Sequence, residues 1–329
     1  MSFLEKGKEE ISNISKNLGG LIFFGTPKFA VPSLKALLEN KENVMLVVTQ
    51  PDKPKGRGKT IQPSEVKQFA LENNLPVIQP EKIKEESFLK LLKELKPEAM
   101  IVVAYGKILP KEILNIPRLG AINLHASLLP KYRGPAPIQW ALIKGESITG
   151  VTTMLIDEGL DTGPVLMQKE VEITEDDDAM SLSNKLSKLG ADLLVETIKK
   201  LRKGEIIPAP QSGQPSYTRM LKKEDGEIDW KADAVEIFNL IRGAYPWPCA
   251  YTFLKGERIK IIKSKVIEGR AKHGLILKAK DELIVGTGRG LLKILLLQPE
   301  GKRVMTAKEF LCGRKINEGV DSFSQSNSS

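Results

Sequence analysis

The sequence predicts a two-part α/β protein: a doubly wound, mostly parallel sheet, followed by a C-terminal β-barrel of the oligonucleotide-binding type. In the first half, short apolar runs alternate with helical patterns, which is typical of βα units around a sheet buried on both faces. In the last third, short β-type runs are separated by glycine and charged residues. At 329 residues, the chain is also longer than one compact domain usually is.

The first half supplies the elements of the parallel sheet. Apolar and helical segments alternate as LIFFG (21–25), FAVPSLKALLEN (29–40), VMLVVTQ (44–50), EVKQFALENN (65–74), LPVIQ (75–79), SFLKLLKELKP (87–97) and AMIVVAYG (99–106). Two more strands are expected within AINLHASLLP (121–130) and ITGVTTMLID (148–157), and a long helix over 179–204. After the first strand, Thr26 is expected to cap a helix whose first residue is Pro27.

The composition changes after the long helix. Residues 204–222 hold three prolines, two glycines and no apolar periodicity, so they are expected to be a linker. We therefore expect a polar extension over 1–19, a catalytic domain over 20–203 and a second domain over 223–329. The second domain is predicted to contain one amphipathic helix (232–243), and its last residues, SFSQSNSS, are expected to be disordered.

Several classes of protein do not fit this sequence. The two cysteines, Cys249 and Cys312, cannot form a disulfide framework, and no ligand spacing suggests zinc or another metal. No apolar run is long enough to span a membrane, and the N-terminal residues suit no secretory or mitochondrial signal. We expect a cytoplasmic protein, and a monomer.

Positive charge is concentrated near the C-terminus. The net charge is +9, and residues 216–329 hold 21 Lys and Arg against 14 Asp and Glu, an excess of 7. From charge alone, a well-solvated surface and a polyanionic partner are both open.

The chain has only two histidines, and one of them lies where catalytic residues are expected. Asn123 and His125 are two positions apart on a predicted strand, so both side chains point to one face at the strand's carboxyl end. Open α/β sheets bind ligands at that end. His273, between a lysine and a glycine, is expected in an exposed loop. A structural role for His125 remains open on these grounds.

A second group of polar residues follows the next strand. Residues 157–164 (DEGLDTGP) bring three carboxylates and two glycines into one turn. Such residues often serve only to form the turn. Alternatively, one carboxylate is held there to orient a histidine and to stabilise its charged form.

Longer motifs give the sequence a family resemblance. In order, over about residues 20–312, the chain carries FFGTPKFAVPSLKALL, VVTQPDKPKGRGK, VVAYGKILPKEIL, AINLHASLLPKYRGPAPIQWALIKGE, TGVTTMLIDEGLDTGPVL and RGAYPWPCAY. These resemble the methionyl-tRNA formyltransferase family. The SLLP stretch with Asn123, His125 and Asp161 resembles the wider superfamily of 10-formyltetrahydrofolate-dependent transferases. The chain departs from the family in its longer N-terminal extension and in Ala126, where relatives often have glycine.

The resemblance implies formyl transfer from 10-formyltetrahydrofolate, as co-substrate, to the α-amino group of methionine on initiator tRNA. Asn123 would donate to the oxyanion, His125 would move the proton and Asp161 would orient the imidazole. No metal is implied. The folate would lie along Tyr105, Gly106 and the stretch Ser127, Leu128, Leu129 and Pro130. Lys55, Arg57 and Lys59 lie in a cationic loop that would meet the acceptor stem of tRNA.

Three other functions would account for part of the sequence. A folate-dependent transferase acting on an amino-sugar nucleotide would resemble this fold, but the cationic loop and the basic last third argue against it. A non-catalytic tRNA-binding protein would not need Asn123, His125 and Asp161 together. A glycinamide ribonucleotide transferase would not need the second domain.

Overall fold

The structure is a computed structural model that describes residues 19–55, 60–312 and 314–326. The chain forms two compact units, each built from several stretches of sequence. The described residues of unit 1 lie within 1–134, 150–171 and 183–217, and those of unit 2 lie within 135–149, 172–182 and 218–329. The domain boundaries expected at 203 and 223 stay a prediction.

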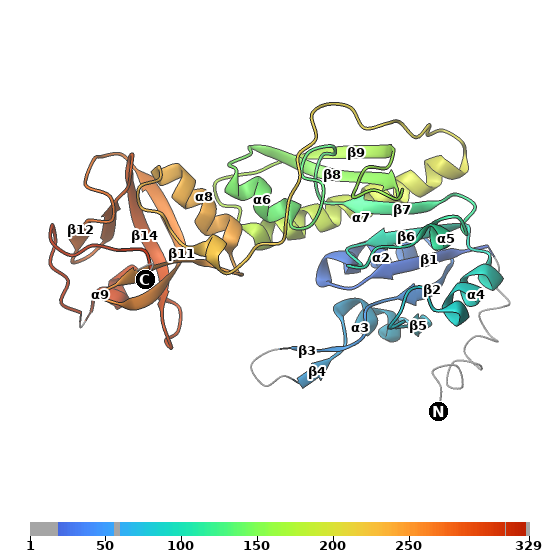
Figure 1. The fold of residues 1–329 in the computed structure, drawn as a ribbon, viewed down its shortest axis with the longest axis horizontal. Helices are drawn as coiled ribbons and strands as arrows, with labels where there is room; N and C mark the ends of the chain where they lie inside the picture. The colour runs from blue at the N-terminus through green and yellow to red at the C-terminus, as the bar shows by residue number, and fades with distance from the viewer. Residues whose placement is uncertain (1–18, 56–59, 313, 327–329) are drawn as a thin grey trace. The chain divides into compact units, whose positions relative to one another are not determined.

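Unit 1 contains the predicted parallel α/β sheet (Figure 1). Its strands follow the order β5-β2-β1-β6-β7-β8-β9, and the first five are paired in parallel. Strand β8 is antiparallel to β7. The bounds are β1 Leu21–Gly25, β2 Val44–Val48, β5 Val77–Ile78, β6 Ala99–Val103, β7 Ala121–His125, β8 Ile148–Leu155 and β9 Val165–Glu172.

Burial explains why these segments form the middle of the sheet. Every residue of β1, β2 and β6 is buried, as expected for strands that are covered on both faces. The chain order reverses between β1 and β6: the strands after β1 build outward on one side, and those after β6 on the other. In open α/β sheets this switch point is where ligands bind, at the carboxyl ends of the strands.

The helices of this half are amphipathic. In α4, Phe88, Leu92 and Leu95 recur at spacings of four and three residues and are buried together against the sheet core. The helix bounds are η1 Lys28–Ala30, α2 Val31–Glu39, α3 Glu65–Glu72, α4 Glu86–Leu95, α5 Lys111–Leu114 and α7 Ala179–Arg202. No described helix is both long enough and apolar enough to cross a bilayer.

The N-terminus of the first helical segment differs from the prediction. Thr26 does not cap a helix; its hydroxyl donates to the carbonyl of Tyr105 at 3.1 Å. Pro27 takes the N-cap position of the short helix η1, and α2 follows directly. The prediction was wrong because Thr26 finds a tertiary acceptor across the switch point, which no local pattern reveals.

Unit 2 contains an antiparallel sheet of the order β10-β11-β14-β13-β12, with β15 paired to β14. The predicted helix is present as α8, Ala234–Ala244, and it packs against α6, Pro137–Ile143. The remaining bounds are η2 Glu224–Gly226, β10 Ala250–Leu254, β11 Glu257–Ile267, β12 Ile276–Ala279, β13 Leu283–Gly286, β14 Leu291–Pro299, β15 Met305–Thr306 and α9 Ala307–Leu311.

Residues 322–324 take part in this sheet, whereas disorder was expected over 322–329; the last three of these lie outside the described residues. Ser324 exchanges two backbone hydrogen bonds with Phe253 of β10, at 3.0 and 2.9 Å, and Ser322 forms a bridge with Leu275 beside β12. Phe323, between them, is buried and stacks on Trp230 with ring centroids 5.4 Å apart. The segment therefore joins the two edge strands, which closes the sheet in the manner of a barrel.

Candidate active site

The predicted pair on β7 lies at the carboxyl edge of the unit 1 sheet. Asn123 is paired with Val102 of β6 and Met154 of β8, and His125 with Thr152 of β8. Both side chains point to the same face because they are two positions apart on a strand. Asn123 is half-buried, and no described residue makes a hydrogen bond with its side-chain amide. An amide in this state can donate to a substrate oxygen.

The two nitrogens of His125 face two oxygen acceptors. Nε2 lies 2.9 Å from the carbonyl oxygen of Tyr132, and Nδ1 lies 3.6 Å from Oδ2 of Asp161. A carbonyl oxygen can only accept, so the first contact requires a proton on Nε2. The same carboxylate oxygen of Asp161 accepts the backbone N–H of Gly134 at 2.7 Å. The structure thus brings His125 and Asp161 together, as expected from the sequence.

Only one of the three carboxylates in the 157–164 turn reaches the histidine. Asp157 accepts from the Thr162 hydroxyl at 2.7 and 2.9 Å and from the Gly159 N–H at 3.0 Å, so it holds the turn together. Glu158 is exposed and pairs with Lys111 at 2.6 Å. Asp161 itself has a left-handed backbone, with φ of 51°. The turn therefore separates a structural carboxylate from one that faces the imidazole.

The SLLP stretch is fixed by groups that the sequence did not indicate. Thr152 Oγ1 donates to the Ser127 carbonyl at 2.6 Å and accepts the Leu129 N–H at 3.1 Å. The Gln168 amide adds a bond to the Leu129 carbonyl at 2.9 Å. Ser127 and Leu129 are buried, whereas Leu128 and Pro130 are partly exposed. Within this stretch, the surface open to a ligand is therefore that of Leu128 and Pro130.

Tyr105 contributes its backbone to the switch point and its ring to the core. The ring is 1% exposed, packs edge-on against Phe24 at 5.3 Å, and burial raises the pKa of its hydroxyl to about 12. Its carbonyl accepts from Thr26 and from Gln50 Nε2, the latter at 2.7 Å. Gly106 follows with φ of 79°, and a β carbon there would lie 2.5 Å from the Gln50 nitrogen. Of these two residues, Gly106 is exposed, whereas Tyr105 is buried and its carbonyl already accepts two hydrogen bonds.

The cationic loop is described only at its base. Lys53–Lys55 (β3) pairs with Thr60–Gln62 (β4), whereas Arg57 and Lys59 and the side chain of Lys55 lie outside the described residues. At the base, Asp52 binds Lys67 Nζ at 2.6 Å and Gln79 Nε2 at 2.7 Å. The Lys67 ammonium lowers the pKa of Asp52 below its ordinary value. These bonds fix where the hairpin leaves the sheet.

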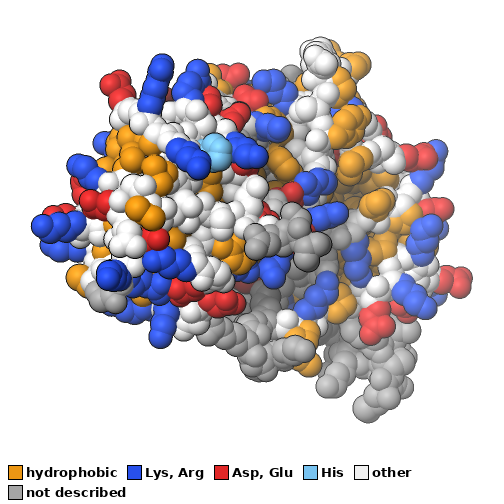
Figure 2. All heavy atoms as spheres, turned by 60° about the vertical axis from the view of Figure 1, so that its left-hand side comes forward, with side chains coloured by type: hydrophobic (Ala, Val, Ile, Leu, Met, Phe, Trp, Pro, Cys, Tyr) orange, Lys and Arg blue, Asp and Glu red, His pale blue; other side chains and the backbone are white. Residues whose placement is uncertain are grey.

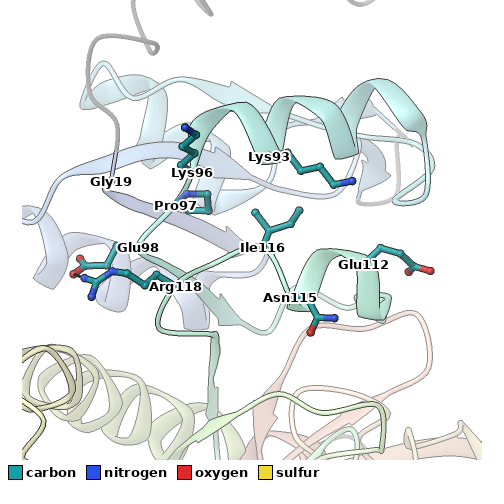
Figure 3. Close-up of a pocket in the computed structure, with 9 residues that line it drawn as sticks. All are labelled: Gly19, Lys93, Lys96, Pro97, Glu98, Glu112, Asn115, Ile116 and Arg118. Atoms are coloured by element: carbon teal, nitrogen blue, oxygen red, sulfur yellow. Dashed lines mark hydrogen bonds and ion pairs between the residues drawn. The ribbon is translucent and has the colours of Figure 1, made fainter.

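A pocket of about 580 Å³ lies at the other edge of the unit 1 sheet (Figure 3). It is lined by residues before β1, β6 and β7, among them Gly19, Pro97 and Arg118, so it is at the amino ends of these strands. None of the residues predicted for catalysis or folate binding lines it. Among the described residues, no cluster of three or more His, Cys, Asp or Glu side chains could hold a metal ion.

Comparison with known proteins agrees with this architecture. The family model described as "Formyl transferase" matches residues 20–198, and that of "Formyl transferase, C-terminal domain" matches 220–315. The chain belongs to the formyl transferase family, and its activity is that of a formyltransferase.

Relatives with curated names cover nearly the whole chain. A methionyl-tRNA formyltransferase of Thermodesulfovibrio yellowstonii is 68% identical over 93% of this chain and 99% of its own. A methionyl-tRNA formyltransferase of Caldanaerobacter subterraneus subsp. tengcongensis is 54% identical over 91% of this chain and 98% of its own.

Solved structures share the fold at low identity. The sugar 3N-formyl transferase WlaRD covers 87% of this chain and 100% of its own, with a TM-score of 0.65 and 23% identity. A methionyl-tRNA formyltransferase from Clostridium thermocellum covers 77% of this chain and 96% of its own, with a TM-score of 0.52 and 19% identity. These likenesses support the fold.

Proposed function

We propose that this formyltransferase moves the formyl group of 10-formyltetrahydrofolate to the α-amino group of methionine on initiator tRNA, giving formylmethionyl-tRNA for translation initiation. The observation that carries the proposal is His125 between the Tyr132 carbonyl and Asp161, beside the Asn123 amide, with which no described residue makes a hydrogen bond. The names of relatives 68% and 54% identical over almost the whole chain favour this acceptor. We also propose that the protein acts as a monomer in the cytoplasm.

The reaction exchanges one carbon–nitrogen bond for another. The neutral α-amino nitrogen attacks the formyl carbon, and the carbonyl oxygen becomes an oxyanion to which the Asn123 amide donates. The attacking nitrogen then loses a proton, N10 of the folate gains one, and the bond between the formyl carbon and N10 breaks. An α-amino group has an ordinary pKa of about 7.7 to 8.0, so a useful neutral fraction exists near pH 7.

His125 is suited to move this proton. With Nε2 donating to the Tyr132 carbonyl, Nδ1 of the neutral ring is the atom that can accept a proton. The Asp161 carboxylate, 3.6 Å from Nδ1, stabilises the imidazolium that results. His125 then returns the proton to the leaving nitrogen. The three side chains thus supply an oxyanion donor, a proton carrier and an orienting charge.

The folate is proposed to lie between Gly106 and the SLLP stretch, at the switch point of the sheet. The partly exposed Leu128 and Pro130 would contact the flat pterin, and the exposed backbone of Gly106 would face its polar edge, while the buried Tyr105 and Ser127 hold these segments in place. The structure of WlaRD, which has a similar fold, was solved in the presence of 5-N-formyl-THF, and this supports a folate as the co-substrate of this chain.

The tRNA is proposed to bind through positive charge. Lys and Arg side chains are numerous on the face shown in Figure 2, with Asp and Glu between them. On β11, Lys263 and Lys265 are exposed, and Lys265 lies opposite Lys293 of β14. Together with the net excess of seven charges beyond residue 215, these favour contacts with the phosphate backbone. Lys55, Arg57 and Lys59 are proposed to meet the acceptor stem.

The acceptor is tested by transfer of labelled formyl from 10-formyltetrahydrofolate. Methionyl initiator tRNA is compared with uncharged tRNA and with an amino-sugar nucleotide. Transfer to the charged tRNA alone is expected, because only it combines a free α-amino group with a polyanion. Transfer to the sugar nucleotide instead would replace the proposed acceptor with an amino sugar, and WlaRD is a sugar 3N-formyl transferase. No transfer to any of the three would overturn the proposed acceptor.

The roles of the side chains are tested by substitution. His125→Ala is expected to lower kcat by about 10²- to 10⁴-fold, and Asn123→Ala by about 10²- to 10³-fold, with tRNA affinity little changed. A well-folded variant that keeps near-normal kcat would remove the role assigned to that residue.

A further inference from the structure

The segment Ala209–Tyr217, which we call the strap, is hydrogen-bonded to other parts of unit 1 near both of its ends, although the sequence predicts a linker there. At one end, Ala209 exchanges two backbone hydrogen bonds with Val165, at 2.8 and 2.9 Å. At the other end, Tyr217 bridges to Arg133, and the Ser216 carbonyl accepts the Arg133 N–H at 2.8 Å. The strap therefore has a defined course across the residues that surround the active site.

One side chain of the strap holds the turn that carries Asp161. The amide nitrogen of Gln211 donates to the carbonyls of Asp161 and Gly163, both at 2.8 Å. Its amide oxygen accepts from Nε and Nη2 of Arg133, at 3.0 and 2.7 Å. Every polar atom of this amide is thus engaged. Because Asp161 has a left-handed backbone, its conformation depends on such outside support.

A second side chain of the strap holds the other partner of the imidazole. The Ser216 hydroxyl accepts the backbone N–H of Tyr132 at 2.8 Å, and Tyr132, with φ of 59°, is also left-handed. The carbonyl of this same residue accepts the proton of His125 Nε2. Ser216 also donates its own N–H to the Pro130 carbonyl at 3.2 Å. The position of the acceptor for Nε2 is therefore set from the strap.

We propose that Gln211 and Ser216 are positioning residues for His125. Gln211 fixes the carboxylate that faces Nδ1, and Ser216 fixes the carbonyl that accepts from Nε2. Arg133 links these two residues, because its guanidinium donates to Gln211 and its backbone N–H donates to the Ser216 carbonyl. Because both groups are held from one segment, the strap sets which ring nitrogen carries the proton and which can accept one. This inference rests on the proposed role of His125 as proton carrier.

The first test compares kcat and KM of Gln211→Ala and Ser216→Ala with 10-formyltetrahydrofolate and methionyl initiator tRNA. Each variant is expected to lose about 10- to 100-fold in kcat while KM changes less than about twofold, because the chemistry is misaligned and the binding surfaces are intact. Ser216→Thr keeps the hydroxyl and should retain kcat within about threefold. Gln298→Ala is the matched control, since that amide also donates to a carbonyl, of Lys302 at 2.8 Å, but in unit 2.

The second test reads the imidazole directly. The chain has two histidines, so ¹⁵N NMR gives two sets of ring signals, and His273→Asn assigns them. Well above the ordinary histidine pKa, wild-type His125 should show the widely separated ring-nitrogen shifts of a ring protonated on Nε2. In Gln211→Ala and Ser216→Ala, the two shifts should move towards the average of both tautomers, whereas in Gln298→Ala they should not.

The outcomes separate this inference from the function on which it rests. If His125→Ala is inactive but both strap variants keep kcat within twofold and the wild-type ring shifts, the strap only braces the fold and the inference is wrong. If His125→Ala itself keeps normal kcat, the proposed function of the site fails, whatever the strap variants show. If Gln211→Ala does not fold, Ser216→Ala decides the question, since it removes a single oxygen from a partly exposed side chain.

Discussion

Replacing Gly163 with alanine should displace the turn that carries Asp161. A β carbon on Gly163 would lie 1.8 Å from the carbonyl oxygen of Leu155 and 2.9 Å from the carbonyl carbon. Real β carbons essentially never approach within 3.0 Å, so the two backbones must separate by at least the difference, 1.2 Å. Leu155 is paired with Ile122 in the sheet, so the turn must move instead.

The cost of this movement follows from the bonds that it breaks. The Leu155 N–H donates to the Pro164 carbonyl at 3.0 Å, and Gln211 donates to the Gly163 carbonyl. Losing both destabilises the protein by about 2 kcal/mol at roughly 1 kcal/mol for each hydrogen bond, which lowers Tm by on the order of 5 °C. A displacement of about 1 Å at a catalytic group costs about 10²-fold in rate.

The assay measures kcat for formyl transfer to methionyl-tRNA, together with Tm from calorimetry. Gly204→Ala is the control: its φ is 70° and no atom lies within 4 Å of the added carbon, so it carries only the backbone cost of about 1 kcal/mol. Its kcat should be that of the wild type. If Gly163→Ala kept both kcat within twofold and an unchanged Tm, the geometry of the turn would not be what aligns Asp161.

Two further predictions concern stability. Asp52→Asn should lower the free energy of unfolding by about 1 kcal/mol at pH 7, because it removes the carboxylate whose pKa Lys67 lowers. That stabilisation is present above the ordinary Asp pKa of 3.8 and is lost as the pH falls through the lower pKa of Asp52 in the folded protein. Urea unfolding curves of the wild type and the variant should therefore differ at pH 7 and converge in acid. Tyr105→Phe should raise the free energy of unfolding by about 1 kcal/mol at neutral pH, because no described residue makes a hydrogen bond with the buried hydroxyl. Burial raises the pKa of this hydroxyl from 10.0 to about 12, so the free energy of unfolding of the wild type should fall between those pH values. The variant has no hydroxyl to ionise and should lack this decrease. Equal alkaline profiles would show that Tyr105 is hydrated in the folded protein.

The sequence by itself determined the two types of sheet. Strands covered on both faces must be apolar throughout, so β1, β2 and β6 were visible as apolar runs between helical patterns. The alternation of side chains along a strand also placed Asn123 and His125 on one face. These features depend on residues close together in the chain, and local patterns therefore reveal them.

The tertiary structure alone decided which distant groups meet. Gln211 is 50 positions from Asp161, and Ser216 is 84 positions from Tyr132, so a polar segment rich in proline looked like a linker. The Tyr105 ring enters the core while its carbonyl faces the switch point, a division between side chain and backbone that a motif does not show.

The pairing of the C-terminal serines was also decided by the tertiary structure. Their composition predicts disorder, yet Ser322 and Ser324 pair with the edges of the unit 2 sheet. Backbone N–H and C=O groups are the same in every residue except proline, so an unpaired strand edge can bind a polar segment as well as an apolar one. Side-chain patterns record what is buried, whereas backbone pairing and side-chain hydrogen bonds depend on where the fold brings the chain.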